Sequence, residues 1–433
     1  MKNLSKVLLS SISVIGVTLS AAVPAHAEPA HDLIGVDYAH SIGLSGKGQV
    51  IAVLDDPIDL NHPQLKGKIS YGHCFATEGD IFRGEAECRG GGRQATGLDA
   101  ARGVIYSDGS RPNASHGMMV SSLIVGNDVP EAPRGIAYDA RVAFYATGSE
   151  SDNVESALRV LAREAKNQGV TAVTISLSNP GTDEGRVACH LSREAKRIEP
   201  LVDALKEADI PVFAASGNDH NHFGFSQRPA CLKNIYAVGA VNDQGRIHTY
   251  TNVGEDLDFL APADVMSADR RGYRESSGTS AATPIMAASY ALLKERYPNI
   301  RHEVILDAMK QTATKVDDIY FDDLPLINLE RAIKYLDRQS PSSIAPVENN
   351  QPAESSSSDQ KITVGTFNGY VVVYAKGYQG RKLSAKIGKD WVIVSSLQSN
   401  FENVKDLTGP GVDIAVRVFI DGELKETINV TTR

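Results

Sequence analysis

The sequence lacks several features that define other classes of protein. Beyond residue 27, no segment reaches the ~20 apolar residues that a transmembrane helix needs. None of its four cysteines forms a CxxC pair, a spacing typical of zinc sites and of thiol redox motifs. Basic residues are not in excess: 44 Lys and Arg against 53 Asp and Glu give a formal net charge of −9. Since an acidic protein repels a phosphate backbone, nucleic acid is not an expected partner.

The first 27 residues have the pattern of a secretory signal peptide. Lys2 and Lys6 form a basic start, an apolar run follows, and Ala25-His26-Ala27 is a small-x-small cleavage site. No stop-transfer segment follows this run, so a retained membrane anchor is the weaker interpretation. We therefore expect an exported monomer, periplasmic or extracellular, without stable membrane insertion. Its net charge without the signal peptide is −11, from 42 basic and 53 acidic residues.

All four cysteines lie in the exported part, at Cys74, Cys88, Cys189 and Cys231. An even number of cysteines in an exported chain favours disulfide bonds over metal ligands. Four cysteines allow three pairings, and their positions alone do not choose among them.

From about residue 34 to residue 336, short apolar runs alternate with amphipathic helical patterns. Continuous apolar runs, typical of strands buried on both faces, occupy residues 50–54, 142–146, 170–177, 211–215 and 235–241. Between them, residues 154–165 and 198–205 repeat apolar side chains at helical spacing. This alternation predicts an α/β fold with a parallel sheet and helices on both faces. In such sheets, sites form at the carboxyl ends of strands.

The composition changes after this region. We predict one α/β domain over residues 28–337, followed by a flexible linker over residues 338–360 that is rich in Ser, Pro, Asn and Gln. Residues 361–433 show no helical period. The runs 370–375, 391–394, 414–420 and 424–430 predict strands, and Asp421-Gly422 predicts a hairpin turn. We therefore expect a small all-β C-terminal domain.

Three reactive side chains stand at the edges of the predicted elements. Asp55 directly follows the apolar run 50–54, and His116 opens a helical stretch. Ser280 lies in Gly278-Thr279-Ser280, just before another helical stretch, where backbone N–H groups suit a developing oxyanion. Taken singly, each is an ordinary cap or turn residue. A carboxylate that orients a histidine base can, however, activate a serine.

The segments around these residues, in this order, resemble the subtilase family over residues 34–336. The resemblance implies a subtilisin-like α/β fold and a serine endopeptidase that cleaves proteins or peptides through an acyl-enzyme. The matching segments are Val53-Leu54-Asp55-Asp56-Pro57-Ile58-Asp59 with His62-Pro63, Ser115-His116-Gly117, Gly135-Ile136-Ala137-Tyr138-Asp139-Ala140, Ala214-Ala215-Ser216-Gly217-Asn218 and, matching best, Gly278-Thr279-Ser280-Ala281-Ala282-Thr283-Pro284.

The resemblance also implies roles for individual residues. It makes Asp55, His116 and Ser280 the catalytic triad and Asn218 the oxyanion donor. It places Ser176, Leu177 and Ser178 in one wall of the main specificity pocket. Asp56 resembles an acid of the kexin-like branch that faces the substrate residue second from the scissile bond. In the alternative interpretation, Pro57 turns Asp56 away from the site.

A disulfide pairing follows from the same comparison. Cys189 with Cys231 resembles a bridge found in many extracellular subtilases. Cys74 with Cys88 would then close a polar, glycine-rich loop that has little core of its own.

Several positions depart from the family pattern. Asp56-Pro57 and the segment Met118-Met119-Val120-Ser121-Ser122 replace more common residues beside Asp55 and His116. Gln64 stands where the family often has an acidic calcium ligand, so we do not carry that calcium site over. His220 and His222 lack a third ligand at zinc spacing. We therefore assign no metal ligand and no cofactor, and calcium stays an open alternative that the sequence assigns to no residues.

Two functions from other classes compete with catalysis. A subtilase scaffold can bind protein without cutting it, as a pseudoprotease. The altered Asp and His segments favour that interpretation, whereas the retained triad and Asn218 oppose it. The C-terminal β domain can instead carry the main role, as an adhesion or targeting module. It has no evident catalytic set, so we treat it as auxiliary.

Overall fold

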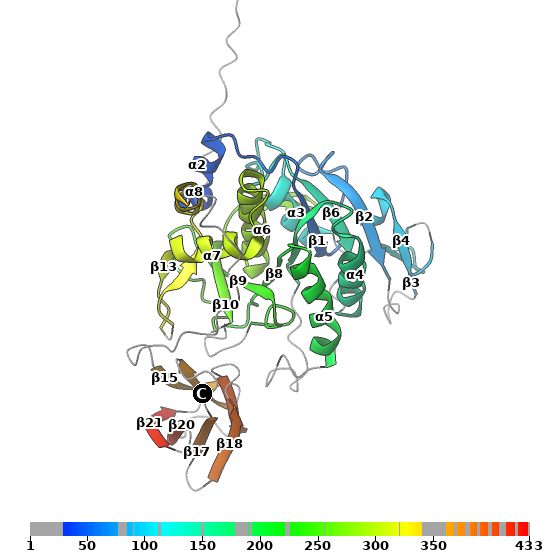
Figure 1. The fold of residues 1–433 in the computed structure, drawn as a ribbon. Helices are drawn as coiled ribbons and strands as arrows, with labels where there is room; N and C mark the ends of the chain where they lie inside the picture. The colour runs from blue at the N-terminus through cyan, green and yellow to red at the C-terminus, as the bar shows by residue number, and fades with distance from the viewer. Residues whose placement is uncertain are drawn as a thin grey trace, which may run out of the picture.

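The computed structural model contains a large, mostly parallel sheet at its centre (Figure 1). It describes residues 29–76, 85–89, 91–110, 114–148, 151–177, 189, 193–220, 226–254, 256–319 and 321–339, together with the C-terminal strands given below. The expected signal peptide, the expected linker from residue 340 onward and the expected Asp421-Gly422 turn lie outside the described residues.

The central sheet is ten-stranded, in the order β13-β14-β10-β9-β8-β7-β1-β6-β2-β4. Neighbouring strands from β14 to β2 are parallel, and the edge strands β13 and β4 pair antiparallel. This confirms the parallel sheet that the apolar runs predicted. The strands are β1 (Val50–Asp55), β2 (Ile69–Phe75), β4 (Gln94–Thr96), β6 (Arg141–Ala146), β7 (Val170–Ile175), β8 (Val212–Ala215), β9 (Ile235–Val241), β10 (Leu257–Pro262), β13 (Thr314–Val316) and β14 (Leu324–Leu326).

The register of the sheet brings several strand ends together. Ile175 of β7 pairs with Leu54 of β1 on one side and with Ala214 of β8 on the other. The residues that follow these positions, Asp55 and Ser176 among them, therefore meet at one edge of the sheet. This is the carboxyl edge, where the sequence predicts the site.

Helices cover both faces of the sheet (Figure 1). On one face α3 (Ser115–Val125) packs against α6 (Thr279–Arg296), and on the other α4 (Ser151–Glu164) packs against α5 (Arg193–Glu207). Helix α6 is buried almost all round from Thr279 to Leu293, as expected of a helix at the centre of a core. The remaining helices are α1 (Pro29–Leu33), α2 (Val36–Ser41), η1 (Leu98–Arg102), α7 (His302–Thr312) and α8 (Leu329–Arg338).

Two short antiparallel strand pairs and two small sheets complete the described structure. The short pairs are β3 (Ala86–Cys88) with β5 (Val104–Tyr106) and β11 (Met266–Asp269) with β12 (Gly272–Glu275). The C-terminal strands form two antiparallel sheets, ordered β15-β16-β19 and β18-β17-β20-β21. Their bounds are β15 (Lys361–Phe367), β16 (Tyr370–Lys376), β17 (Lys382–Ile387), β18 (Asp390–Ser396), β19 (Phe401–Asp406), β20 (Asp413–Ile420) and β21 (Glu423–Thr431).

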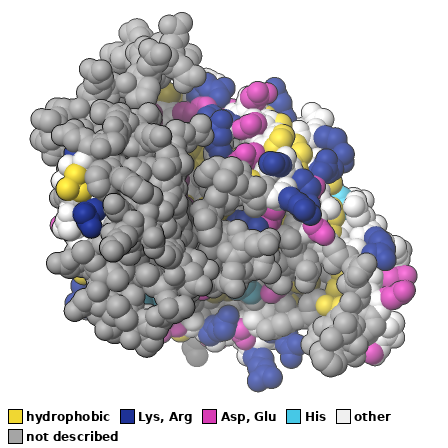
Figure 2. Space-filling model, turned by 90° about the horizontal axis from the view of Figure 1, so that it is seen from below, with side chains coloured by type: hydrophobic (Ala, Val, Ile, Leu, Met, Phe, Trp, Pro, Cys, Tyr) yellow, Lys and Arg dark blue, Asp and Glu magenta, His cyan; other side chains and the backbone are white. Residues whose placement is uncertain are grey.

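The surface carries charges of both signs. Figure 2 shows the molecule from below, with Lys and Arg side chains interspersed with Asp and Glu side chains on the described part of this face. No helix among the described residues has both the length and the apolar character that crossing a bilayer requires.

Candidate active site

Asp55 and His116 meet at the carboxyl edge of the sheet. Asp55 ends β1 and is fully buried, and His116 stands in the first turn of α3. His116 Nδ1 donates to Asp55 Oδ1 at 2.7 Å, and the Asp56 backbone N–H donates to the same oxygen at 2.7 Å. A proton on Nδ1 leaves Nε2 as the acceptor of the neutral ring. The carboxylate therefore orients the imidazole as a base.

Close packing explains the glycine after His116. A Cβ on Gly117 would lie 1.9 Å from the Asp56 carbonyl oxygen, so only glycine lets α3 approach the end of β1 this closely. Pro57 is accommodated in a similar way. A Cβ on Gly103, whose φ is +70°, would lie 2.2 Å from Pro57 Cγ. The uncommon proline is thus matched by a glycine on a neighbouring segment.

Asp56 faces the imidazole. Its carboxylate and the facing atoms of Asp55 and His116 all lie within 4.8 Å of one another. Burial and then the charge of Asp55 raise the pKa of Asp56 to about 6, although His116 acts in the opposite direction. The carboxylate therefore points toward the site, in contrast to the alternative in which Pro57 turns it away.

The two acids also determine the charge state of His116. Burial lowers the pKa of His116, but the charge and hydrogen bond of Asp55 and the charge of Asp56 outweigh it and raise this pKa to about 9. A base must be neutral to accept a proton. In the free protein, the neutral His116 ring that can act as a base is therefore the main form only under alkaline conditions.

Ser280 is the second residue of α6 and is partly exposed. Its hydroxyl donates to the Ser176 carbonyl oxygen at 2.9 Å, and the described residues show no hydrogen bond between it and His116. Ser176 directly follows β7. Rotation about one side-chain bond redirects such a hydroxyl. The structure thus brings Ser280 to the same sheet edge as the Asp55–His116 pair, with its proton held by a backbone carbonyl.

The Asn218 side chain has a defined orientation. Its Oδ1 accepts from the Thr279 backbone N–H at 2.9 Å and from the Thr279 hydroxyl at 3.1 Å. The Thr279 Oγ1 in turn accepts from the Gly217 backbone N–H at 3.2 Å. With Oδ1 used in this way, Nδ2 is left to donate toward the site.

The N-terminus of α6 supplies a second donor. The Gly278 N–H donates to the Tyr250 hydroxyl at 2.9 Å, and the Thr279 N–H is used by Asn218. The Ser280 N–H has no acceptor within the described part of the chain. Ser280 N–H and Asn218 Nδ2, neither with an acceptor in the described part of the chain, both lie within 4 Å of the Cβ position of Gly278. Two donors placed together can stabilise an oxyanion.

The remaining expected pocket residues are only partly described. Ser176 is buried, and Leu177 is half-buried against the core. Ser178 lies outside the described residues.

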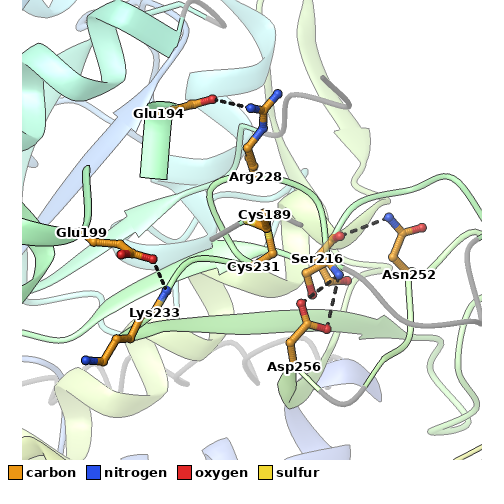
Figure 3. The surroundings of a disulfide bond; sticks show 10 residues. Cys189, Glu194, Glu199, Ser216, Arg228, Cys231, Lys233, Asn252 and Asp256 are labelled. Atoms are coloured by element: carbon orange, nitrogen blue, oxygen red, sulfur yellow. Dashed lines mark hydrogen bonds and ion pairs between the residues drawn. A yellow bond between two sulfur atoms is a disulfide. The ribbon is translucent and has the colours of Figure 1, made fainter. Parts of the chain in front are cut away.

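The structure contains two disulfides, in the pairing that the resemblance implies. Cys74 and Cys88 have a Cα–Cα distance of 5.8 Å, and Cys189 and Cys231 one of 6.0 Å. Figure 3 shows the second bridge with the Arg228–Glu194 ion pair on one side and the Asn252–Ser216 hydrogen bond on the other. Ser216 begins the segment that carries Asn218, so this bridge lies next to that segment.

Comparison with known proteins identifies the family. The model of the subtilase family matches residues 46–326. The chain belongs to this family. As a subtilase, it is a serine-type endopeptidase that acts on proteins or peptides.

Individual relatives agree with this assignment. Subtilisin NAT of Bacillus subtilis subsp. natto is 26% identical over 298 residues, which are 68% of this chain and 68% of that protein. Subtilisin Savinase of Lederbergia lenta is 26% identical over 299 residues, which are 68% of this chain and 94% of that protein. A solved protease structure from Pseudoalteromonas arctica shares the fold, with a TM-score of 0.56 at 20% identity, and the match covers 70% of this chain and 94% of that chain.

The calcium site that subtilases often place after the His-Pro pair does not fit the residues found here. Gln64 is fully buried, and its Nε2 donates to the Pro133 carbonyl at 2.8 Å. Asn127 Nδ2 donates to the Pro63 carbonyl at 2.9 Å and to the Lys66 carbonyl at 3.2 Å. Calcium needs several oxygen ligands that point at the ion, usually with carboxylates. In this subtilase, amide N–H groups face the backbone carbonyls instead, and the single oxygen left over is the buried Gln64 Oε1, which has no partner among the described residues.

Another cluster with metal-binding residue types is already engaged. Asp209, His302 and Glu303 have ligand atoms within 4.8 Å of one another. Asp209 accepts from His302 Nδ1 at 2.9 Å and from Lys294 Nζ at 2.7 Å. These bonds, with burial opposing them, hold the pKa of Asp209 well below its usual range. An ammonium group thus supplies the positive charge that a metal would supply.

The motifs pointed to the triad and Asn218, but they missed the residues that hold Asn218 and the turn before Ser280. Thr279 stands within the best-matching segment, so its position was available and only its hydrogen bonds were not. Tyr250 and Asn252 lie in no motif. No signal in the sequence singled them out.

Proposed function

We propose that this subtilase is an exported endopeptidase in which Asp55, His116 and Ser280 form the triad and Asn218 completes the oxyanion hole. The observation that carries the proposal is the 2.7 Å bond between His116 Nδ1 and Asp55 Oδ1, which leaves Nε2 free at the edge where Ser280 lies. The 27-residue leader pattern supports export.

The reaction proceeds in two halves. Ser280 Oγ attacks the carbonyl carbon of the scissile bond while His116 Nε2 takes the hydroxyl proton. The oxyanion accepts from Asn218 Nδ2 and the Ser280 N–H. Breaking the C–N bond releases the amine, which leaves with the proton from His116. Water then attacks the acyl-enzyme with His116 again as base, and Ser280 recovers its proton as the acid product leaves.

The Ser280–Ser176 hydrogen bond favours one competing function, a scaffold that binds peptides without cutting them. In that case the hydroxyl would stay on the Ser176 carbonyl when a peptide binds. In the catalytic case the bound substrate and His116 draw it away. The two functions differ in whether Ser280 reacts.

The test measures labelling by a fluorophosphonate probe and cleavage of a peptide library by the exported protein. Wild type should be labelled and cleave peptides, and Ser280→Ala and His116→Ala should lose several orders of magnitude in turnover. Ser156→Ala is a matched control, because Ser156 is a half-buried serine on α4 whose hydroxyl donates to the Asp152 carbonyl of the same helix at 2.8 Å. A protein that binds peptides, takes up no probe and cuts nothing would be the scaffold, and near-full activity of Ser280→Ala would refute the mechanism.

A further inference from the structure

Two separate segments form the oxyanion hole, and a third segment contacts both. The first runs from Ser216 to Asn218 after β8, and the second is the turn before Ser280. The third is residues 249–252, between β9 and β10. We propose that Tyr250 is a positioning residue that fixes these two segments relative to each other. The inference rests on the proposed function, because it deepens the role given to Asn218 and Ser280.

Tyr250 holds the Ser280 turn through its hydroxyl. The phenolic oxygen accepts from the Gly278 N–H at 2.9 Å, and Ser277 Oγ lies 3.3 Å from it. Gly278 is the N-cap of α6 and has a φ of +91°, a conformation that favours glycine. The hydroxyl thus anchors the peptide that enters the helix, two residues before Ser280.

The backbone of Tyr250 holds the other segment. Its carbonyl accepts from the His220 N–H at 3.0 Å, two residues beyond Asn218. Asn252 adds to this contact: its N–H donates to the Gly217 carbonyl at 3.0 Å, and its Oδ1 accepts from the Asp219 N–H at 3.0 Å. Its Nδ2 donates to the Ser216 carbonyl at 3.2 Å (Figure 3). Hydrogen bonds therefore hold the residues directly before and directly after Asn218.

Tyr250 is itself fixed. The His248 ring stacks on it with a centroid distance of 4.6 Å and an interplanar angle of 15°. His248 Nε2 donates to the Asp264 carboxylate at 2.8 Å. The ring is half-buried, and burial raises the pKa of Tyr250, which keeps the phenol neutral. A rigid, neutral group of this kind is suited to setting the position of a backbone N–H.

The geometry matters because the donors act on the transition state. Oxyanion donors stabilise the developing charge only when they are placed before the reaction begins. A small displacement of such groups costs rate without weakening the binding of the ground state. Removing the hydroxyl leaves the Gly278 N–H without its acceptor. The turn before Ser280 then loses a contact that holds it relative to the segment of Asn218. We therefore expect Tyr250 to affect kcat rather than KM.

The experiment compares Tyr250→Phe with wild type on a chromogenic peptide, with kcat expressed per active site titrated by a fluorophosphonate. This normalisation removes any unfolded fraction. Tyr335→Phe is the matched control, because Tyr335 of α8 is also half-buried and its hydroxyl donates to Gln311 Oε1 of α7 at 2.8 Å. Tyr250→Phe should lower kcat about tenfold with KM nearly unchanged, and Tyr335→Phe should change neither.

A second measurement tests the route of the effect. In an Asn218→Ala background, Tyr250→Phe should cost much less than in wild type, because groups that act as one unit are not additive. An unchanged kcat in Tyr250→Phe, a change in KM alone, or full additivity with Asn218→Ala would overturn the positioning role while leaving the proposed function intact. A wild-type protein without Ser280-dependent cleavage would overturn both.

Discussion

Thr279 holds Asn218 through a single oxygen: its backbone N–H and its hydroxyl both donate to Asn218 Oδ1, at 2.9 and 3.1 Å. An amide held in this way has no freedom to exchange its oxygen and nitrogen, so Nδ2 is left as the donor that the proposed mechanism needs. Because Thr279 directly precedes Ser280, the nucleophile and the donor are fixed by neighbouring residues of one turn.

The first prediction follows from this contact. Asn218→Ala should lower kcat by about 10²–10³, the range known for such a donor in subtilisin, with KM nearly unchanged. Thr279→Val keeps the backbone N–H and removes only the hydroxyl, so its loss of kcat should be smaller. Steady-state kinetics on one peptide separate the two parameters. A variant of Asn218 that mainly loses substrate affinity would contradict the assignment.

The second prediction concerns pH. With the pKa of His116 raised to about 9, the free enzyme carries a protonated base at neutral pH. The rate constant kcat/KM should therefore rise with pH and level off only above about 9. In Asp56→Asn a negative charge beside the imidazole is lost, so the pKa of His116 should fall and the rise should shift to lower pH. A pH–rate profile that is the same for both proteins would contradict the influence of Asp56.

The third prediction concerns specificity. The Asp56 carboxylate, in a partly desolvated cleft, should favour Lys over Ala at the substrate residue second from the scissile bond. A preference of about tenfold needs only ~1.4 kcal/mol of differential transition-state binding. Because the pKa of Asp56 is raised to about 6, the acid is charged above that pH, and the preference should grow as pH rises through 6. Paired peptides that differ at that residue measure it.

Two controls accompany the peptide pair. Asp56→Thr should lose the preference, since it removes the charge and keeps a side chain common in subtilases at this position. Added salt should weaken the preference in wild type, because it screens a partly exposed ion pair. If wild type cuts both peptides equally, the carboxylate serves the imidazole alone.

The parts of the site that could be predicted from the sequence are those carried by local pattern. Asp55 could be placed because five apolar residues precede it in β1, and His116 because a helical stretch follows. The parallel order of the strands then brought their ends together. Such features depend on neighbours along the chain and on a general rule for α/β sheets.

The parts that could not be predicted depend on side-chain contacts between distant residues. Tyr250 meets Gly278 across 28 positions, and no periodicity marks either residue for the other. The direction of Asp56 was left open because Pro57 restricts the backbone but does not determine where the preceding side chain points. Pro284 is a helix-breaking residue type, yet α6 begins at Thr279 and continues through it. Burial of α6 on all sides stabilises this helix despite the missing N–H.

The fourth prediction concerns the disulfides. Each bridge should contribute roughly 2–4 kcal/mol to stability by restricting the unfolded chain. The Cys189–Cys231 bridge spans 42 positions and the Cys74–Cys88 bridge 14. In the chain-entropy account this difference makes the longer bridge worth about 1 kcal/mol more. Denaturant unfolding of the two Cys→Ala pairs tests the order, and non-reducing peptide mapping that finds Cys74 bonded to Cys189 would reject the pairing.

The last prediction is that the turn after His62-Pro63 needs no calcium ion. The Gln64 amide donates to the Pro133 carbonyl, a position at which a bound cation would instead need an oxygen ligand. Any change of the wild-type melting temperature between a chelator and millimolar calcium should therefore persist in Gln64→Ala, because it does not arise at this turn. Gln64→Ala should lower the melting temperature equally in both, because a carbonyl that loses its buried donor costs about 1–3 kcal/mol.

Replacing the Gln64 amide by a carboxylate should make the stability of the protein depend on calcium, in contrast to Gln64→Ala. Gln64→Glu sets a negative oxygen against the Pro133 carbonyl, so it should destabilise the protein in a chelator and recover stability when calcium supplies the missing positive charge. Asn61→Asp, an exposed change in the same turn, controls for added surface charge and should show no such recovery. If wild type loses stability in a chelator and Gln64→Ala does not, an ion binds at Gln64 and the amide does not replace it. The buried Gln64 Oε1, which has no partner among the described residues, would then be its ligand.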